Sequence, residues 1–293
     1  MLPLHGHNSP ISALEFSADS QHLLSASKDG ILCLWDGMQL CWQVATSDGN
    51  ASALAFSKMN SLFHGGSNRH VYERNLNDGN LIQQIPINSA QGGITSLRWL
   101  YSGAILAIGM GERGKPSLGG IYFVTMTPKQ VAPPLIRDYF GVTTLADHGA
   151  SRLIAWANAN REVIVRDLSK VDSVSIHPKY NVTSLAIAPD GLHIAVAADW
   201  SVKIFDFINK SARHVLDGHK GIVQTVAYTP DGQQVISGSS DRTIRIWHAT
   251  GGKELLTMEF PLARITRIAI APDGLRAAVG DETGAILLWD LDS

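Results

Sequence analysis

Histidine and cysteine are the side chains of this sequence that could hold a metal ion or move protons near neutral pH. The chain has 11 histidines and two cysteines. Their spacing matches no zinc-binding motif, and the chain contains neither a Gly-x-Ser-x-Gly elbow nor a phosphate-binding loop. The sequence therefore predicts no metal, no cofactor and no catalytic residue.

The two cysteines allow two interpretations. Cys33 and Cys41 flank a short turn at Asp36, Gly37 and Met38, so paired strands could bring them face to face. They could then form a cross-strand disulfide. Two reduced, buried thiols that fill space in a sheet are the alternative, which we favour because free cysteine behaves as a small apolar side chain.

Length, composition and charge favour a folded protein. The chain has 293 residues, of which 45% are hydrophobic and 17% charged, enough for a large core. Its net charge of -2 provides no basic surface for a nucleic-acid backbone. The first residues do not resemble a signal peptide, and no apolar run approaches the ~20 residues that cross a bilayer. We expect a cytoplasmic protein with no nucleic-acid or membrane partner.

Seven short apolar segments recur along the chain, several of them ending in Trp-Asp. They occupy residues 31–36, 71–75, 121–125, 163–167, 202–207, 244–248 and 286–290. Most intervals are 39 to 42 residues long, and one reaches 50. Two alternating runs joined by a turn signal precede each segment, so each segment is predicted to be the third strand of a repeated unit.

Each unit is predicted to be a four-stranded antiparallel meander of about 40 residues. One unit could not bury both of its faces, whereas seven units stacked around an axis would cover them. We therefore predict an all-β, seven-bladed β-propeller that spans residues 1–293 as a single domain. Residues 1–4 are expected to close the ring as the outer strand of the last blade, which removes an exposed edge.

The sequence resembles the WD-repeat family in its Gly-His and Trp-Asp dipeptides. Gly6-His7 and Gly218-His219 match the first dipeptide; Trp35-Asp36 and Trp289-Asp290 match the second, and Trp247-His248 is a near match. The resemblance implies that a hydrogen-bonded set of four side chains locks a blade. Blade one supplies His7, Ser25, Asp29 and Trp35, and blade six supplies His219, Ser237, Asp241 and Trp247 at the same spacing. The other blades depart from this pattern and are expected to rely on packing.

The inner strands are expected to place a ring of polar residues at the mouth of the central channel. These residues are Ser12, Ser52, Thr95, Thr143, Thr183, Gln224 and Thr266. The ring could bind a small ligand or a peptide backbone, or it could simply line a wet channel, which we favour. It contains no carboxylate and no histidine, and this argues against an enzyme.

Aromatic and basic residues gather in the loops of blades three to five. The glycine-rich segment 109–120 is expected to form a long turn of blade three on the face that carries the Gly-His loops. The candidate partner-binding residues are Arg113, Lys115, Arg137, Tyr139, Phe140, Lys179, Tyr180 and Trp200. Tyr, Trp, Phe and Arg dominate the energetics of interfaces. Alternatively, the aromatic side chains anchor loops between blades, and the glycine-rich segment is a mobile loop without a ligand.

The resemblance to WD-repeat proteins implies a non-catalytic protein-interaction scaffold or adaptor, because that face is their usual partner-binding face. One or more proteins or peptides would be the partners of a chain that we expect to be a monomer. A propeller enzyme of the hydrolase or lyase class and a small-ligand sensor, acting at the channel mouth, are the alternatives.

Overall fold

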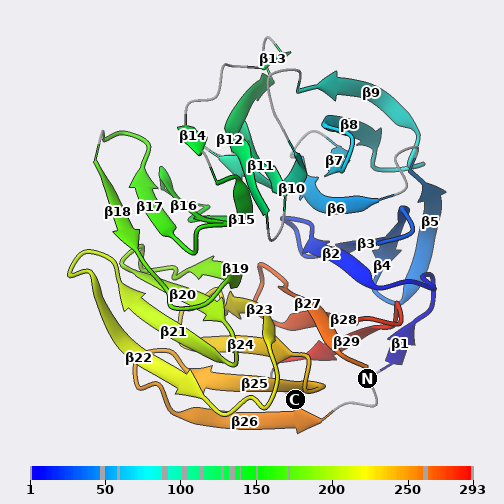
Figure 1. Cartoon of the computed structure of the whole chain (residues 1–293). Helices are drawn as coiled ribbons and strands as arrows, with labels where there is room; N and C mark the ends of the chain where they lie inside the picture. Colours follow the sequence, from blue (N-terminus) through cyan, green and yellow to red (C-terminus); the bar gives the residue numbers. More distant parts are fainter. Residues whose placement is uncertain are drawn as a thin grey trace.

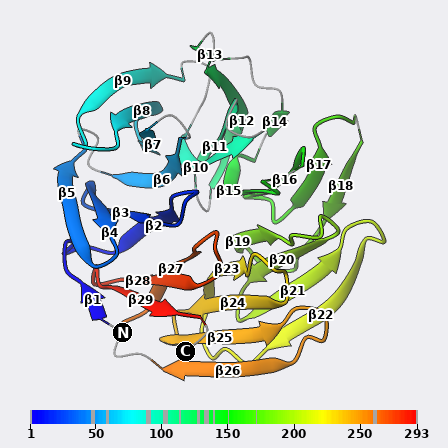
Figure 2. The ribbon, with the colours of Figure 1, turned by 180° about the vertical axis from the view of Figure 1, so that it is seen from behind.

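The computed structural model of the chain describes residues 2–46, 50–57, 60–87, 92–100, 105–112, 115–126, 129–131, 136–138, 140–149, 151–170, 172–259 and 263–291. These residues form seven antiparallel β-sheets. The sheets stand around a central axis as blades (Figure 1), and the view from behind shows the same closed ring (Figure 2). The expected all-β, seven-bladed β-propeller is confirmed.

Each blade runs from an inner strand at the axis to an outer strand at the rim. Blade one contains β2 (Ile11–Phe16), β3 (His22–Ser27), β4 (Ile31–Asp36) and β5 (Gln39–Ala45). Blade two contains β6 (Ala51–Phe56), β7 (Ser61–Gly66), β8 (His70–Asn75) and β9 (Leu81–Pro86). Blade three contains β10 (Gly93–Leu100), β11 (Ile105–Glu112), β12 (Lys115–Met126) and β13 (Lys129–Val131), and β14 (Ile136–Asp138) also pairs with β12.

The remaining blades follow in chain order. Blade four contains β15 (Val142–Asp147), β16 (Leu153–Asn158), β17 (Val163–Asp167) and β18 (Ser173–Ile176). Blade five contains β19 (Val182–Ile187), β20 (His193–Ala198), β21 (Ser201–Asp206) and β22 (Ser211–Asp217). Blade six contains β23 (Val223–Tyr228), β24 (Gln234–Ser239), β25 (Thr243–His248) and β26 (Glu254–Glu259). Blade seven contains β27 (Ile265–Ile270), β28 (Arg276–Asp281), β29 (Ile286–Asp290) and β1 (Leu2–Leu4).

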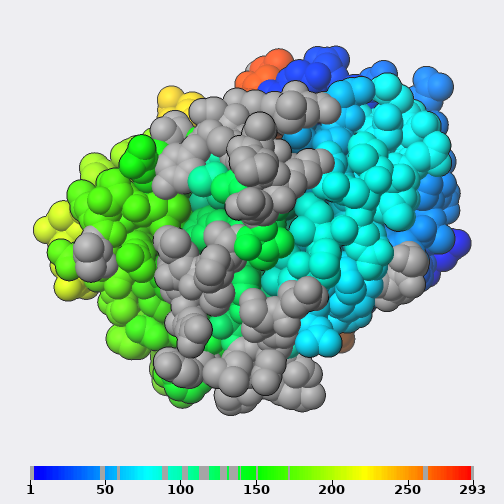
Figure 3. Space-filling view, turned by 90° about the horizontal axis from the view of Figure 1, so that it is seen from above, coloured from blue at the N-terminus to red at the C-terminus, as the bar shows by residue number. Residues whose placement is uncertain are grey.

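Neighbouring blades bury their faces against one another. An apolar cluster fills each of the seven junctions, and at the junction of blades one and two it contains Leu24, Leu34 and Leu54. The middle strands are covered on both sides, so every residue of β7 is buried. Complete burial of a leucine side chain contributes roughly 2 kcal/mol. Packing between blades is therefore the main source of stability. Seen from the side of the ring, cyan and green residues of adjoining blades lie side by side (Figure 3).

The N-terminal strand closes the ring as predicted. β1 pairs antiparallel with β29, with Leu2 opposite Leu288 and Leu4 opposite Ile286. Leu4 is 2% exposed and joins the apolar cluster between blades seven and one. The outer edge of blade seven is thus formed by the other end of the chain. None of the described segments is a helix with the length and apolar character required to span a bilayer.

The glycine-rich segment of blade three differs from the expected long turn. Its first part lies in β11 and its last part in β12, so both strands of this hairpin are longer than those of the other blades. The glycines allow close packing: a Cβ on Gly111 would lie 2.6 Å from the Val142 amide nitrogen, and one on Gly109 would lie 2.9 Å from the Val142 side chain. Glycine is needed here for close approach between blades three and four.

Candidate partner-binding surface

Blade six contains the complete hydrogen-bonded set that the sequence predicts. His219 Nε2 lies 2.8 Å from Ser237 Oγ, and Trp247 donates its indole N–H to the same oxygen at 2.9 Å. His219 Nδ1 lies 3.0 Å from the Asp241 carboxylate. Because the carboxylate only accepts, the ring donates from Nδ1 and accepts the Ser237 hydroxyl proton at Nε2.

The role of this hydrogen-bonded set is structural. Ser237 is 0% exposed, and its oxygen already accepts the Trp247 N–H. Burial lowers the pKa of His219, although Asp241 opposes this, so the ring is neutral near pH 7. Burial alone would raise the pKa of Asp241, but hydrogen bonds from Thr243 and the Lys220 N–H outweigh it and lower that pKa to about 2. The set resembles a Ser-His-Asp triad whose serine no substrate can reach.

Blade one contains the same residue types with one additional member. His7 Nε2 lies 2.7 Å from Ser25 Oγ, which also accepts the Trp35 indole N–H at 2.9 Å. His7 Nδ1 lies 3.0 Å from Ser27 Oγ, and this hydroxyl donates to Asp29. Asp29 therefore acts through Ser27 instead of contacting His7 directly. Burial lowers the pKa of His7 to about 4.

The expectation that the other blades rely on packing alone is wrong for blade four. Trp156 stands on β16 where blade one has Ser25, and it donates its indole N–H to Asp138 at 2.9 Å. Asn158 donates to the same carboxylate at 3.2 Å. Asp138 lies 18 residues before Trp156, as His7 does before Ser25. Blade four thus has a hydrogen-bonded set at the same positions as blade one but with different residue types, and the buried polar groups of this set have partners. We call each such set the lock of its blade.

Blade two also contains a substitute lock. His64 takes the place of Ser25 and Arg74 that of Trp35. Arg74 Nε donates to His64 Nε2 at 3.0 Å, and the His64 ring stacks on Tyr72 with 4.8 Å between the ring centroids. Burial and the Arg74 charge lower the pKa of His64 to about 3, so the histidine remains a neutral acceptor.

Each of the seven predicted ring residues is the extra residue of a β-bulge in its inner strand. Four hydroxyls donate to a carbonyl oxygen of the next blade. Ser52 donates to Ile94 at 2.7 Å, Thr95 to Val142 at 2.9 Å, Thr183 to Val223 at 2.6 Å, and Ser12 to Ala51. These hydroxyls are therefore committed to holding successive blades together.

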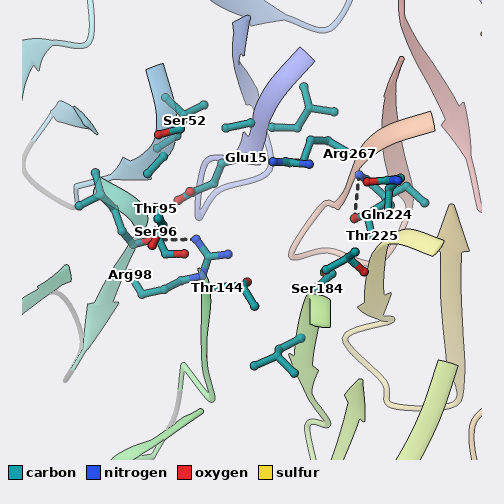
Figure 4. Close-up of a pocket in the computed structure, with 18 of the residues that line it drawn as sticks. Glu15, Ser52, Thr95, Ser96, Arg98, Thr144, Ser184, Gln224, Thr225 and Arg267 are labelled. Atoms are coloured by element: carbon teal, nitrogen blue, oxygen red, sulfur yellow. Dashed lines mark hydrogen bonds between the residues drawn. The ribbon is translucent and has the colours of Figure 1, made fainter. Parts of the chain in front are cut away.

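The wall of the central channel contains charged side chains at positions outside the seven-residue ring. Glu15 and Arg98 extend into a cavity of about 130 Å³, together with Arg267 (Figure 4). Glu15 accepts the Phe56 N–H of blade two at 3.1 Å, and Arg98 Nε lies 3.6 Å from Asp147. Burial raises the pKa of Glu15 to about 7, although Arg98 lowers it in part. The argument from an uncharged ring was thus incomplete. The sequence did contain a signal for these charged residues. At the position of Glu15 in blade one and Arg98 in blade three, the other five inner strands have alanine.

The cysteines and histidines form no metal site in the described part of the chain. Both cysteines are free; Cys33 is buried, whereas Cys41 is exposed. β4 and β5 do pair, but the residue opposite Cys33 is Gln43. The favoured interpretation of two buried thiols is therefore correct for Cys33 and wrong for Cys41. Burial raises the pKa of Cys33 to about 12.

The predicted partner-binding residues are only partly described. Arg113 and Tyr139 lie outside the described residues, and only the backbone is described for Lys115 in β12 and Arg137 in β14. Phe140, Tyr180 and Trp200 are 38%, 44% and 57% exposed, so none of them is tucked between blades. Lys179 is also exposed, and its Nζ lies 5.1 Å from the centre of the Tyr180 ring.

Phe140, Tyr180 and Trp200 lie on one face of the ring, which we call the upper face. It is formed by the loops that precede the inner strands and by the turns between second and third strands. These three are the exposed aromatic side chains of the described residues. Ile222, which sequence reasoning missed, is 43% exposed in the upper loop before β23. Phe140, Tyr180, Trp200 and Ile222 are hereafter the apolar patch.

Hydrogen bonds connect the loops that carry the apolar patch. Asp138, the acceptor of the blade four lock, also accepts the Phe140 N–H at 2.9 Å. The Arg161 guanidinium donates to the Lys179 carbonyl at 3.0 Å, which joins blade four to blade five. Val223 N–H donates to the Asp199 carbonyl at 2.7 Å and joins blade five to blade six. The loops of three blades therefore form one supported surface.

Comparison with known proteins agrees with this architecture. The family model described as "WD domain, G-beta repeat" matches residues 2–36, 169–206 and 210–248. An uncharacterized WD repeat-containing protein of Synechocystis sp. is 32% identical over 142 residues, which are 47% of this chain and 41% of that protein. The small ribosomal subunit protein RACK1y of Oryza sativa subsp. japonica is 35% identical over 77 residues, 26% of this chain and 23% of that protein.

A third relative is the target of rapamycin complex subunit LST8 of Bos taurus, which is 27% identical over 150 residues, 50% of this chain and 44% of that protein. The matched regions cover less than half of the length of each of these relatives. The repeat matches, the seven blades and the hydrogen-bonded sets of blades one and six agree with one another: the chain is a seven-bladed β-propeller that contains WD repeats.

Proposed function

We propose that this chain is a non-catalytic scaffold or adaptor that binds a protein partner through the upper face of blades four to six. One observation carries the proposal: the three exposed aromatic side chains of the described residues gather on this face, beside Ile222. Aromatic side chains bury much area with few rotatable bonds to freeze, which suits them to interfaces.

The relatives support the same class of function. RACK1y is named as a small ribosomal subunit protein and LST8 as a subunit of a target of rapamycin complex, so both are components of larger assemblies. The family also supports a non-catalytic role. The charged groups of the channel contact neighbouring strands, as Glu15 does with the Phe56 N–H, which supports a structural role for them.

Affinity capture with matched variants tests the proposal. The test variant combines Tyr180→Ala with Trp200→Ala, and the control combines Leu192→Ala with Ile208→Ala. The control residues are 48% and 62% exposed on the lower face of the same blade. Circular dichroism and thermal melts establish that all three proteins are folded.

The intact protein and the control should recover the same specific partner from a native lysate, and the test variant should recover about tenfold less or none. If the test variant retains the partner in full, the upper face of blades four to six is not the binding surface. If the control alone loses the partner, the lower face is the binding surface.

A further inference from the structure

The cavity inside the central channel carries two arginine side chains. The described residues that line it all belong to the seven inner strands, so it lies on the axis of the ring (Figure 4). Arg98 enters it from blade three and Arg267 from blade seven, two blades that are not neighbours. The cavity of about 130 Å³ is close in size to the ~150 Å³ of a protein cavity that holds benzene. It can therefore hold a molecule of about six non-hydrogen atoms.

Arg267 occupies a position at which other blades contact their neighbour. Ser96, Ser184 and Thr225 stand at the corresponding point of their inner strands, directly after the bulge residue. Each of these hydroxyls accepts a backbone N–H of the next blade, at 3.1 or 3.2 Å. A guanidinium has no acceptor, so an arginine cannot make this contact. Arg267 instead supplies a positive charge to the channel.

The charged groups of the cavity do not cancel in mild acid. Glu15 is the carboxyl group among the described lining residues, and the carboxylate of Asp147, outside the lining, is 3.6 Å from Arg98 Nε. Burial raises the pKa of Glu15 to about 7, so this carboxyl is mostly neutral near pH 6. The guanidiniums of Arg98 and Arg267 then oppose the Asp147 carboxylate alone, which leaves one net positive charge. Ionisation of Glu15 above pH 7 reduces this sum to zero.

The strands packed around Glu15 contribute few other charges. The inner strands on either side are β6, which has no ionisable residue, and β27, which contributes Arg267. The second strands β3 and β28 have their ionisable residues at the strand ends, and these are His22, Arg276 and Asp281. Arg98 and Asp147 are the charges that shift the pKa of Glu15. The charge of the cavity near neutral pH is therefore set by Glu15.

Two neutral side chains of the cavity have no hydrogen-bond partner among the described residues. They are the hydroxyl of Thr144 and the amide of Gln224. Gln224 stands where the ring of every other blade has a serine or threonine. Its amide offers both a donor and an acceptor. The Arg98 side chain is 42% exposed, so small solutes can reach this cavity from solvent.

We propose that the cavity binds one small monocarboxylate with a hydroxyl or carbonyl group, a 2-hydroxy acid or 2-oxo acid of about three or four carbons. The single negative charge of this ligand matches the net charge of the cavity. Arg98 and Arg267 hold the carboxylate, because guanidinium and carboxylate match in charge and planar geometry. Thr144 and Gln224 offer the neutral donors and acceptors that its other oxygen needs.

Glu15 has a separate part in this site. In its protonated form one oxygen still accepts the Phe56 N–H, while the O–H can donate to the carboxylate of the ligand. The site binds its ligand without chemistry. The proposal therefore goes beyond the scaffold function and does not depend on the upper face.

Ligand-observed NMR titration of the full chain with lactate and with pyruvate tests the proposal. The buffer contains no carboxylate or phosphate, and inorganic phosphate is titrated separately as a comparison. The test variant is Arg267→Gln. The control is Arg264→Gln, in the loop before the same strand, where the arginine side chain is 67% exposed and outside the cavity. Circular dichroism and thermal melts establish that each variant is folded.

At pH 6 the intact protein and Arg264→Gln should bind lactate or pyruvate at one saturable site. Arg267→Gln should bind the same acid at least about tenfold more weakly. Binding to the intact protein should weaken about tenfold from pH 6 to pH 8, because Glu15 loses its proton over this range. Glu15→Gln remains neutral and should bind equally well at both pH values.

Three results overturn the proposed site: no saturable binding of either acid at pH 6, equal binding to Arg267→Gln and the intact protein, or preference for inorganic phosphate over both acids. An equal loss of binding at pH 8 in Glu15→Gln and the intact protein overturns the part of Glu15. If Arg267→Gln does not fold, Arg98→Gln takes its place with the same expected loss.

Discussion

Blade six and blade four satisfy the same buried positions with different residues. In blade six, His219 precedes the inner strand and contacts Ser237 on the second strand, while the indole comes from Trp247 on the third. In blade four, Asp138 precedes the inner strand and accepts the indole N–H of Trp156 on the second strand. In both blades a hydrogen bond therefore joins two positions 18 residues apart, and the residue types at these positions differ while donor still meets acceptor.

Removing the acceptor of blade four should have the largest effect. Asp138→Ala leaves the Trp156 indole N–H buried without a partner and removes one of the two carboxylates to which the Asn158 amide donates, so the free energy of unfolding should fall by about 3 kcal/mol. Asp138→Asn keeps one acceptor oxygen and should cost less. Chemical denaturation measures both variants, and equal stability of Asp138→Ala and the intact protein would contradict the lock in blade four.

The matching change in blade six should cost slightly less. Ser237→Ala removes the oxygen that accepts the Trp247 N–H and the hydroxyl that donates to His219, and we expect a loss of about 2 kcal/mol in the free energy of unfolding. Ser240→Ala, three residues further along the chain in the upper turn, is the control and should change stability by less than about 0.5 kcal/mol. A similar loss in both variants would show that the lock contributes little.

The hydrogen-bonded sets that contain histidine should contribute less to the stability of the folded chain in acid. The set of blade four contains no histidine. The pKa of His7 falls from 6.5 to about 4 on folding. Between these values the unfolded chain binds a proton that the folded chain does not, so this contribution is complete above pH 6.5 and is lost as the pH falls toward 4. We expect about 2 kcal/mol of destabilisation at pH 5 from His7 alone.

Urea unfolding at pH 7.5, 6 and 5 measures this effect. His7→Gln keeps a donor and an acceptor but does not titrate in this range, so its stability should vary less with pH. If the intact protein and His7→Gln lose stability equally between pH 7.5 and 5, His7 is not neutral in the folded blade.

The last prediction concerns the inner ring, where a neutral and an ionisable side chain make the same kind of contact. Ser184 Oγ accepts the Val226 N–H of the next blade at 3.2 Å. In blade one the acceptor is the ionisable side chain of Glu15, which accepts the Phe56 N–H of the next blade. The pKa of Glu15 rises from 4.5 to about 7, so the folded chain holds the proton longer and stability falls as the pH rises through this range. Glu15→Gln should therefore be more stable than the intact protein by about 3 kcal/mol at pH 8 and equal to it at pH 4. Lower stability of Glu15→Gln at pH 8 would contradict the assignment.

Most of the fold could be predicted from the sequence because strand periodicity and turn residues recur at a nearly constant interval. The third strands and the pairing of residues 2–4 with blade seven follow from that repetition. The hairpin of blade three could not be predicted in the same way. Its glycines resemble a loop in sequence, but Gly109 and Gly111 permit contact with a neighbouring blade, which is a property of the packed ring.

The sites were predictable where residue type and spacing coincide. His219, Ser237, Asp241 and Trp247 satisfy both conditions, and so does the set of blade one. The locks of blades two and four were missed because their residue types differ while their positions match. Ile222 was missed for another reason: an isoleucine beside an apolar strand looks like core, and only the structure shows its exposure.

Photo-crosslinking tests the proposed binding surface most directly. A photoreactive phenylalanine analogue is placed at position 200 in one protein and at position 208, on the lower face of the same blade, in another. Irradiation in native lysate should crosslink one specific partner to position 200 and leave position 208 without it. A partner crosslinked to position 208 alone, or equally to both positions, would contradict the proposal that the upper face of blades four to six binds the partner.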